Sequence, residues 1–336
     1  MKIINHAIIG CGRVAKNHIM AARSNGMNVV CCCDFDVAKA KKIALDKNIP
    51  NYTDDYKVLI DDPRIDSVSI CTDHQSHTFI ASDFLDKKHI IIEKPLSSDL
   101  QSAIDFCGKA KRSSKKIMVI SQHRYDDIMK LVKKMLEDKA MGNVTMINVE
   151  LACSRDDNYY LNSYWRGKKE KEGGSTVINQ AYHLVDLIVC LFGMPNEVKS
   201  YCDVLKFKNI IDTEDSCAAL FRYNGCLCTF STTNTATKVW ATRVKITGTK
   251  GDIEFNIDFP PHVTNTNLEQ NNYDSEILLI NNRFKENLNN PINYYGLSHI
   301  NQFENFAKAI LYDDAIDVTV DEALKTLKLI NLIYNS

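Results

Sequence analysis

The stretch Ala7-Ile8-Ile9-Gly10-Cys11-Gly12-Arg13-Val14-Ala15 decides the fold of the first part of the chain. Three apolar residues typical of a buried strand lead into a Gly-x-Gly-x-x-Ala turn, and a helix-type stretch follows over residues 14–24. Gly10 permits a tight turn, Gly12 lets a ligand approach the backbone, and Ala15 lets the helix pack close to the sheet. The free N–H groups at the start of the helix then favour a bound phosphate.

An acidic residue follows the second predicted strand, residues 28–33. Asp34 stands 24 residues after Gly10, where a carboxylate accepts hydrogen bonds from ribose hydroxyls. A carboxylate there repels a 2′-phosphate, and the run Asp34-Phe35-Asp36 contains no basic residue. The sequence therefore predicts NAD rather than NADP as cofactor, and a glycine turn in an unrelated α/β domain is the alternative.

Strand-type and helix-type stretches alternate through the first third of the chain, which is typical of a parallel sheet with crossover helices. Strands are expected at 7–9, 28–33, 67–71, 89–92 and 117–121, and helices at 14–24, 37–46, 77–85 and 98–110. This pattern predicts an NAD-binding Rossmann domain over residues 1–121.

The pattern changes near residue 122. We expect helices at 128–138, 176–192, 300–311 and 320–334, a strand at 144–151, a loop at 258–292, and antiparallel strands within 197–257 with turns at 223–225 and 248–251. The overall prediction is an α/β protein. Its second domain, residues 122–336, has a large, mainly antiparallel open sheet for substrate binding and oligomerisation, and the last helices are available to pack back on the first domain.

Composition excludes several classes of protein. The 336 residues carry a formal charge of −1 and no long basic run, which argues against nucleic acid binding. No apolar run reaches the roughly 18–20 residues of a membrane span. The 12 cysteines lie mostly in apolar segments, and Cys31, Cys32 and Cys33 are consecutive. We expect free thiols in a cytoplasmic protein, with no metal site.

Further motifs occur in a fixed order along the chain. After the glycine loop come Cys71 to His77, Glu93-Lys94-Pro95, Gln122-His123-Arg124-Tyr125, Gly173-Gly174, Asn179…His183…Asp186, Gly248-Thr249-Lys250-Gly251 and Asp321-Glu322-Ala323. Together they resemble the glucose–fructose oxidoreductase, inositol dehydrogenase and rhizopine-catabolism (Gfo/Idh/MocA) family over nearly the whole chain. The resemblance implies hydride transfer between a sugar-like alcohol and nicotinamide, and a homodimer or homotetramer built on the open sheet.

The resemblance also implies roles for particular residues. Lys94 and His183 are the expected catalytic pair. The expected cofactor-binding residues are Gly10, Gly12, Arg13, Val14, Ala15, Asp34, Thr72, His77, Glu93, Lys94, Gln122, Trp165 and Arg166. The expected substrate-binding residues are Lys94, Arg124, Tyr164, Asn179, His183, Asp186 and His299. The chain departs from the family where Thr72-Asp73-His74 replaces Thr-Pro-Asn and where Asn179 replaces an aspartate.

Physical chemistry favours Lys94 for proton transfer. Lys94 follows a predicted strand at the carboxyl end of the sheet, where open α/β sheets bind ligands. Burial beside the cationic nicotinamide would lower its pKa toward neutrality, although a lone lysine is more often a surface residue.

The helix expected at 176–192 supports a role for His183. At 100° per residue Asn179, Tyr182, His183, Asp186 and Cys190 share one arc, and the glycine pair just before it would allow close approach of a ligand. A solvated helix face is the alternative for that arc. Asp186 either orients His183 or only balances local charge.

An aromatic loop precedes this helix. Tyr159, Tyr160, Tyr164 and Trp165 suit stacking on a sugar, or form a small hydrophobic cluster beneath the loop. Arg166 and Arg124 are candidate anion partners.

The loop and Asn179 look most like the nucleotide-sugar 3-dehydrogenases and 3-ketoreductases of the family. We therefore expect NAD-dependent oxidation, or the reverse, at C3 of a nucleotide-linked sugar or sugar uronic acid, in cell-surface polysaccharide biosynthesis. One alternative is a free sugar or inositol-type dehydrogenase. Another is a regulator that senses NAD or sugar without turnover.

Overall fold

The computed structural model describes residues 3–257, 260–269, 272–287 and 297–336. They form two compact units, each with its own sheet. The first unit comprises residues 1–122 and 296–327, and the second comprises 123–295 and 328–336.

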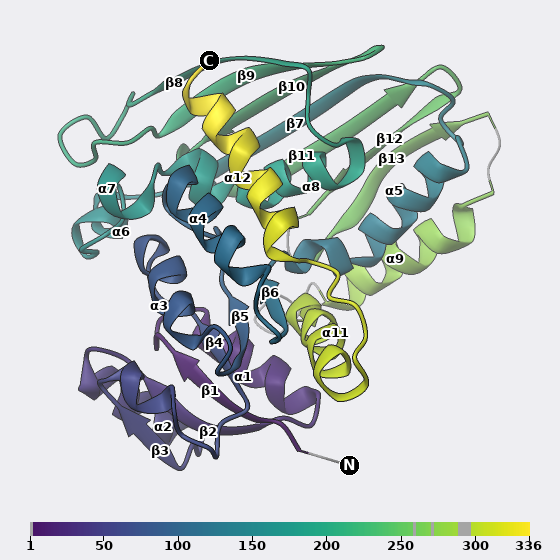
Figure 1. Cartoon of the computed structure of the whole chain (residues 1–336). Coiled ribbons are helices and arrows are strands. Elements are labelled where there is room, and N and C mark those ends of the chain that lie inside the picture. Colours follow the sequence, from purple (N-terminus) through teal and green to yellow (C-terminus); the bar gives the residue numbers. More distant parts are fainter. Residues whose placement is uncertain (1–2, 258–259, 270–271, 288–296) are drawn as a thin grey trace. The chain divides into compact units, whose positions relative to one another are not determined.

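The sheet of the first unit has six parallel strands in the order β3-β2-β1-β4-β5-β6 (Figure 1). The strands are β1 (Asn5–Ile9), β2 (Asn28–Cys33), β3 (Asn51–Thr53), β4 (Ser67–Ile70), β5 (His89–Ile92) and β6 (Ile117–Val119). This order is that of a dinucleotide-binding Rossmann sheet, which confirms the predicted fold class. The sequence prediction lacks β3, because this short edge strand is polar and has no fully buried residue.

Helices connect the strands of the first unit. They are α1 (Ala15–Ser24), α2 (Val37–Asp46), α3 (His77–Phe84) and α4 (Leu100–Ala110), with short 3₁₀ turns at Tyr56–Leu59 and His74–Ser76. A distant segment, α11 (Leu297–Tyr312), packs on α1. Its Phe303 and Phe306 are fully buried in the same apolar cluster as Ile8 and Ile19.

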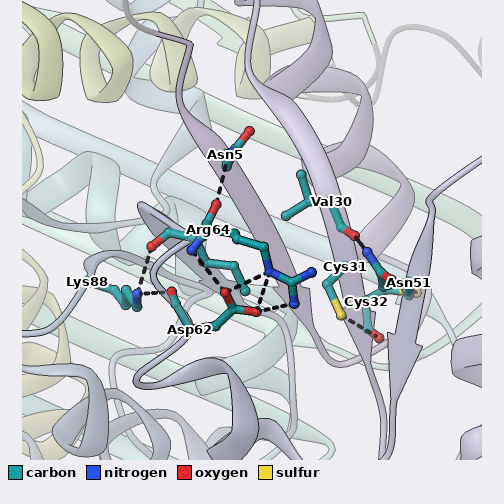
Figure 2. Close-up of polar contacts among 9 residues, drawn as sticks. Asn5, Val30, Cys31, Cys32, Asn51, Asp62, Arg64 and Lys88 are labelled. Carbon is teal, nitrogen blue, oxygen red and sulfur yellow. Dashed lines mark hydrogen bonds and ion pairs between the residues drawn. The ribbon is translucent and has the colours of Figure 1, made fainter.

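Polar contacts hold the amino ends of the strands in the first unit (Figure 2). Lys88 is buried, and its Nζ donates to the carbonyl oxygens of Asp62 at 2.6 Å and Ile65 at 2.7 Å. Burial lowers the pKa of Lys88. Asn5 donates through Nδ2 to the carbonyl oxygen of Arg64 at 2.8 Å. These bonds fix the loop before β4 at the amino-terminal edge of the sheet. The glycine turn and the candidate functional residues lie at the opposite, carboxyl-terminal edge.

The second unit contains a seven-stranded sheet in the order β13-β12-β11-β7-β10-β9-β8. Its strands are β7 (Val144–Ser154), β8 (Glu197–Asp203), β9 (Ser216–Tyr223), β10 (Cys226–Thr233), β11 (Thr235–Gly248), β12 (Gly251–Asn256) and β13 (His262–Leu268). Among the described strands of this sheet, only β7 and β10 pair in parallel. The mainly antiparallel sheet and its turns at 223–225 and 248–251 are as predicted.

One face of this sheet is buried, since inward residues alternate with exposed ones along β9 and β10. Helices of the unit are α5 (Asp127–Glu137), α6 (Asp157–Leu161), α7 (Lys169–Glu172), α8 (Tyr182–Phe192) and α9 (Asp274–Asn287), with α5, α8 and α9 over the sheet in Figure 1. The last helix, α12 (Val320–Tyr334), begins in the first unit and ends in the second.

Two predictions for the second unit are wrong. The expected loop at 258–292 contains β13 and α9, because asparagines at exposed strand positions hid the alternating pattern; residues 258–259, 270–271 and 288–292 lie outside the described residues. The expected helix at 176–192 is two elements, a π-helical turn η4 (Thr176–Gln180) and α8, separated at Ala181.

In the part of the chain that the structure describes, no single helix has the length and apolarity needed to cross a membrane. The bent pair Lys169–Gln180 and Tyr182–Phe192 meets those two criteria only when its members are taken together.

Gly10→Ala should destabilise the protein more than Gly26→Ala. Both glycines have positive φ, +92° and +72°, but a Cβ at Gly10 would lie 2.5 Å from the Cys71 carbonyl oxygen, whereas Gly26 has open space. We expect a loss about 1–3 kcal/mol larger for Gly10→Ala, measured as the free energy of unfolding in urea. Equal losses would contradict the close approach of β1 and β4 at this turn.

Candidate active site

The glycine turn and the start of α1 form an open phosphate cradle. Helix α1 begins at Ala15, and its N-cap residue Val14 provides no side-chain hydrogen bond to the first turn. A Cβ built at Gly12 would meet nothing within 4 Å, so the backbone is open to an incoming group there. Arg13 is exposed beside it. Uncapped N–H groups beside open space fit a pyrophosphate.

Asp34 joins the end of β2 to the glycine turn. Its Oδ2 accepts from the Cys11 N–H at 2.8 Å and its Oδ1 accepts from the Asp36 N–H at 3.0 Å. Each carboxylate oxygen has a second lone pair, so these bonds orient Asp34 while leaving it able to accept from a ribose. The residues present therefore fit the adenosine half of NAD.

Lys94 follows β5 and is partly exposed. Its backbone N–H donates to Oε2 of the buried Glu93 at 3.0 Å. The other carboxylate oxygen, Oε1, lies 2.8 Å from His18 Nε2 and 3.7 Å from His299 Nε2. Burial would raise the pKa of Glu93, but the hydrogen bond from His18 and the nearby His299 hold it well below its usual range. Glu93 thus carries a charge directly behind Lys94.

A buried polar chain continues from Glu93 into the first unit. His18 Nδ1 lies 2.9 Å from Ser69 Oγ, which lies 2.7 Å from His6 Nε2. Burial, with the nearby His18, lowers the pKa of His6 to about 3. The structure therefore places Glu93 and His299, expected to bind cofactor and substrate, in a buried network. Glu93 supports the backbone of Lys94, and His299 lies beside Glu93.

His77 and Gln122 are likewise buried. The His77 ring lies 2.7 Å from the Pro95 carbonyl oxygen and 3.2 Å from that of Thr72, so it joins the two loops around Lys94. Gln122 is 2% exposed and opens the 3₁₀ turn Gln122–Tyr125. Thr72 is partly exposed. His77, which was expected to bind the cofactor, therefore uses its ring to hold these two loops in position.

In the second unit, His183 lies at the start of α8 and is partly exposed. The ring of the buried His123 packs edge-on against it, with ring centroids 4.7 Å apart and an interplanar angle of 74°. His123 Nδ1 lies 2.7 Å from Asp126 Oδ2. The Asp126 carboxylate therefore fixes the ring that supports His183.

Arg124 forms a two-pronged ion pair with Asp186. Its Nε and one terminal nitrogen donate to the two carboxylate oxygens at 2.8 and 2.7 Å, and both side chains are mostly buried. Burial alone would lower the pKa of Arg124, but the charge and hydrogen bonds of Asp186 raise it above its usual value. Of the two roles expected for Asp186, this pairing supports charge balance. Asp186 neutralises the positive charge of Arg124, which was expected to bind a substrate anion.

The predicted polar arc of the helix is wrong. Because η4 and α8 are separate, Asn179 is not related to His183 by 100° per residue. Tyr182 and Asp186 are buried, so the arc is not a solvated face either. A ligand was expected to approach the glycine pair closely, but at Gly174 the Tyr334 side chain does so instead. A Cβ on Gly174 would lie 2.0 Å from the Tyr334 hydroxyl.

Asn179 lies in η4 and is held from behind. Its Nδ2 donates to Oε1 of Glu172 at 2.5 Å, and Oε2 of that carboxylate accepts from the Gly167 N–H at 2.5 Å. Glu172 is fully buried at the end of α7. Burial raises its pKa to about 7.

A second buried acid, Glu214, holds the same turn. Its carboxylate accepts from the Ser175 and Val177 N–H groups and from the Tyr334 hydroxyl, at 2.9–3.1 Å. Burial raises the pKa of Glu214. The backbone of η4 is therefore fixed by a carboxylate from another loop and by the end of α12.

The aromatic loop divides into a buried and an open part. Tyr160 packs with Phe207 and Ile211, which is the small hydrophobic cluster that was one of two alternatives. The Arg166 guanidinium lies 4.5 Å from the centroid of Tyr159 and 5.0 Å from that of Trp165. Tyr164 is half exposed. Arginine and aromatic faces thus remain at a partly open surface, where they suit sugar or phosphate.

Sequence reasoning missed the supporting acids and histidines. Glu172 ends a basic run, Lys168 to Lys171, that looked like a solvated loop, and its only signal is the glycine pair that follows. His123 stands within a recognised motif but was given no role. His18, Glu214 and Tyr334 act over 37 or more residues of sequence, so local patterns carry no sign of them.

Breaking the buried pair in the second unit should cost stability that a double substitution recovers. Arg124→Met or Asp186→Leu each leaves a buried charge uncompensated, and we expect a loss of about 3–5 kcal/mol. The double variant should lose less than either single variant, as measured by urea unfolding of all four proteins.

The exposed pair of Lys87 with Asp61 provides the control, since Lys87→Met should leave stability unchanged. Additive losses at Arg124 and Asp186 would show that the two side chains do not depend on each other.

Comparisons with known proteins cover both units. Residues 4–121 match the sequence model of the oxidoreductase family with an NAD-binding Rossmann fold (GFO_IDH_MocA), and residues 129–254 match its C-terminal domain. The uncharacterized oxidoreductase YrbE of Bacillus subtilis is 26% identical over 74% of this chain and 73% of its own length. Oxidoreductase P35 of Formosa agariphila is 27% identical over 58% of this chain and 63% of its own length.

Solved structures that share the fold include two dehydrogenases. The WlbA dehydrogenase from Bordetella pertussis, in complex with NADH and UDP-GlcNAcA, has a TM-score of 0.90 and 23% identity, covering 100% of this chain and 95% of its own. Levoglucosan dehydrogenase, in complex with NADH and levoglucosan, has a TM-score of 0.84 and 22% identity, covering 100% and 97%. At these identities the likeness shows the fold alone.

Proposed function

We propose, from the premise that the chain belongs to the GFO/IDH/MocA oxidoreductase family and is an NAD-dependent dehydrogenase acting on CH–OH groups, that its substrate is a nucleotide-linked sugar or sugar uronic acid oxidised at C3. The reverse reduction of the 3-keto sugar follows the same path. NAD, when bound, supplies the hydride acceptor.

The observation that carries this proposal is the neutral amide of Asn179, held by Glu172. An amide can donate to one sugar oxygen and accept from another, but it cannot act as acid or base. Proton transfer is therefore left to other groups, and Asn179 recognises a hydroxyl that does not react. The substrate class is supported by the WlbA dehydrogenase, which was solved with UDP-GlcNAcA.

Lys94 and His183 move the proton in this mechanism. As the C–H bond of the substrate breaks, its hydroxyl proton passes to Lys94, and His183 stabilises or receives it. The charge of Glu93 fixes the backbone of Lys94, and the His123–Asp126 pair fixes the ring beside His183. Fixed groups of this kind lower the barrier because orientation is set before reaction.

The remaining residues bind. Backbone groups of Gly10, Gly12, Arg13, Val14 and Ala15 hold the pyrophosphate, and Asp34 holds the adenine ribose. Thr72, Gln122, Trp165 and Arg166 complete the cofactor side, and Tyr164 stacks on the sugar. Arg166 replaces Arg124 as the proposed partner of a substrate carboxylate, because Arg124 is already paired with Asp186.

The open sheet face supports a homodimer or homotetramer. Tyr201, Leu220 and Leu227 are 88%, 59% and 52% exposed on it. Apolar residues gathered on an open sheet favour a self-complementary contact. We also propose residues 1–121 as the NAD-binding domain and 122–336 as the substrate domain of a cytoplasmic enzyme of polysaccharide biosynthesis.

The purified protein should reduce NAD with a nucleotide-linked sugar. The experiment follows NADH absorbance with UDP-GlcNAcA, the free sugar levoglucosan and inositol, and locates the product ketone by borodeuteride reduction. Lys94→Ala and His183→Ala should each lower kcat by at least about 100-fold. His183→Ala should leave NAD affinity the same.

Lys87→Ala, an exposed lysine, is the matched control and should keep full activity. Turnover of levoglucosan or inositol alone would favour the free-sugar alternative. Binding of NAD and sugar without turnover, unaffected by Lys94→Ala, would favour a regulator.

A further inference from the structure

Glu172 occupies an unusual position for a charged residue. Its side chain is fully buried, and its two oxygens bond to different segments: Oε2 to the Gly167 N–H and Oε1 to Asn179 Nδ2, both at 2.5 Å. The mechanism above uses Glu172 only to hold Asn179, and the family comparison assigns it no role. Burying a carboxylate costs free energy unless hydrogen bonds or opposite charges compensate it.

We propose that Glu172 is a positioning residue that sets the orientation of the Asn179 amide, and so selects substrates that present a hydroxyl donor to Asn179 Oδ1. This inference rests on the proposed function for its substrate, but the orientation of the amide is a property of the free protein.

The direction of the amide follows from the chemistry of its partner. An ionised carboxylate has no proton and only accepts hydrogen bonds, so the NH2 of Asn179 must face Glu172. The carbonyl oxygen Oδ1 then points away from Glu172. A substrate hydroxyl that donates meets a matching acceptor, whereas an ether oxygen at the same place meets another acceptor and is rejected.

The backbone at Gly167 fixes the position of the Glu172 carboxylate. Gly167 has φ +68°, and a Cβ there would lie 2.3 Å from Ile211 Cγ2, so the loop packs tightly at this point. The Asp212 N–H donates to the Gly167 carbonyl oxygen at 3.0 Å. With Gly167 fixed on both sides, its N–H holds one carboxylate oxygen of Glu172, and the other oxygen accepts from Asn179.

The protonation of Glu172 changes this arrangement near neutral pH. Burial, with the neighbouring Glu214, raises the pKa of Glu172 from 4.5 to about 7, while the Gly167 N–H, Asn179 and Arg166 oppose the rise. Tyr160 also faces Glu172, and burial raises the pKa of its hydroxyl above the usual value, so it stays neutral over this pH range. Below pH 7 the carboxyl gains a proton and can donate, so the amide can turn around.

The same shift predicts the sign of two pH dependences. KM for the sugar should rise as pH falls below about 7, because the fixed Oδ1 acceptor is lost. The stabilising effect of a raised carboxyl pKa is complete below its unfolded value and is lost as pH rises to about 7. Glu172→Gln should remove both dependences.

The test compares Glu172→Gln, Asn179→Asp and the double variant. In Glu172→Gln the Gly167 N–H claims the amide oxygen, so the new NH2 faces Asn179 and turns its amide around; KM should rise about tenfold with little change in kcat. Asn179→Asp places two carboxylates side by side and should also impair binding. In the double variant the NH2 of the introduced glutamine donates to the introduced aspartate carboxylate, so KM should return to within about threefold of the wild type.

Glu170→Gln, an exposed neighbour on the same short helix, should change nothing. Urea unfolding and NAD affinity of each variant show whether the fold is intact. An unchanged KM in Glu172→Gln, or a double variant no better than the worse single variant, would overturn the inference.

A measurement on the free protein separates this inference from the proposed function. The side-chain ¹⁵N–¹H signals of Asn179 should shift with a midpoint near pH 7 in the wild type and stay constant in Glu172→Gln. If no sugar is oxidised but the signals shift, the proposed substrate fails and the orientation by Glu172 stands. If the Asn179 signals are the same in the wild type and in Glu172→Gln at every pH, the inference fails whatever the activity.

Discussion

Burying a carboxylate behind a functional loop is the constraint on which both units depend. An ionised acid out of water needs donors on every side, and the nearest donors are backbone N–H groups. Glu93 draws in the backbone of Lys94, Glu172 that of Gly167, and Glu214 those of Ser175 and Val177. The loops therefore take the one conformation that satisfies the charge, and their side chains are aimed before any ligand arrives.

The two units satisfy this constraint with different chemistry. In the first unit histidine is the donor, and a chain of rings and hydroxyls from His6 to Glu93 keeps the acid ionised. In the second unit the donors to Glu172 are a neutral side-chain amide and a backbone N–H, so the pKa of Glu172 stays at about 7. Near neutral pH the charge of Glu93 is thus constant, whereas the charge of Glu172 changes with pH.

Local patterns predicted what depends on local physics. The glycine turn, Asp34 and the alternating strands were sufficient for the Rossmann sheet, because each depends on backbone geometry within a few residues. The π-helical turn at Thr176–Gln180 was missed, since a five-residue widening leaves the apolar pattern of a helix almost intact. The roles of Glu172 and His299 depend on partners brought together only by the tertiary fold, and no pattern within one segment records them.

Helix α11 and the end of α12 affect how the two units fold during synthesis of the chain. Phe303 and Phe306 complete the core of the first unit, and Tyr334 completes the hydrogen bonds of the second. Neither unit can finish its interior from the contiguous stretch that supplies most of it. During synthesis both must wait as incomplete structures until residues beyond 296 leave the ribosome, so their folding is coupled in time.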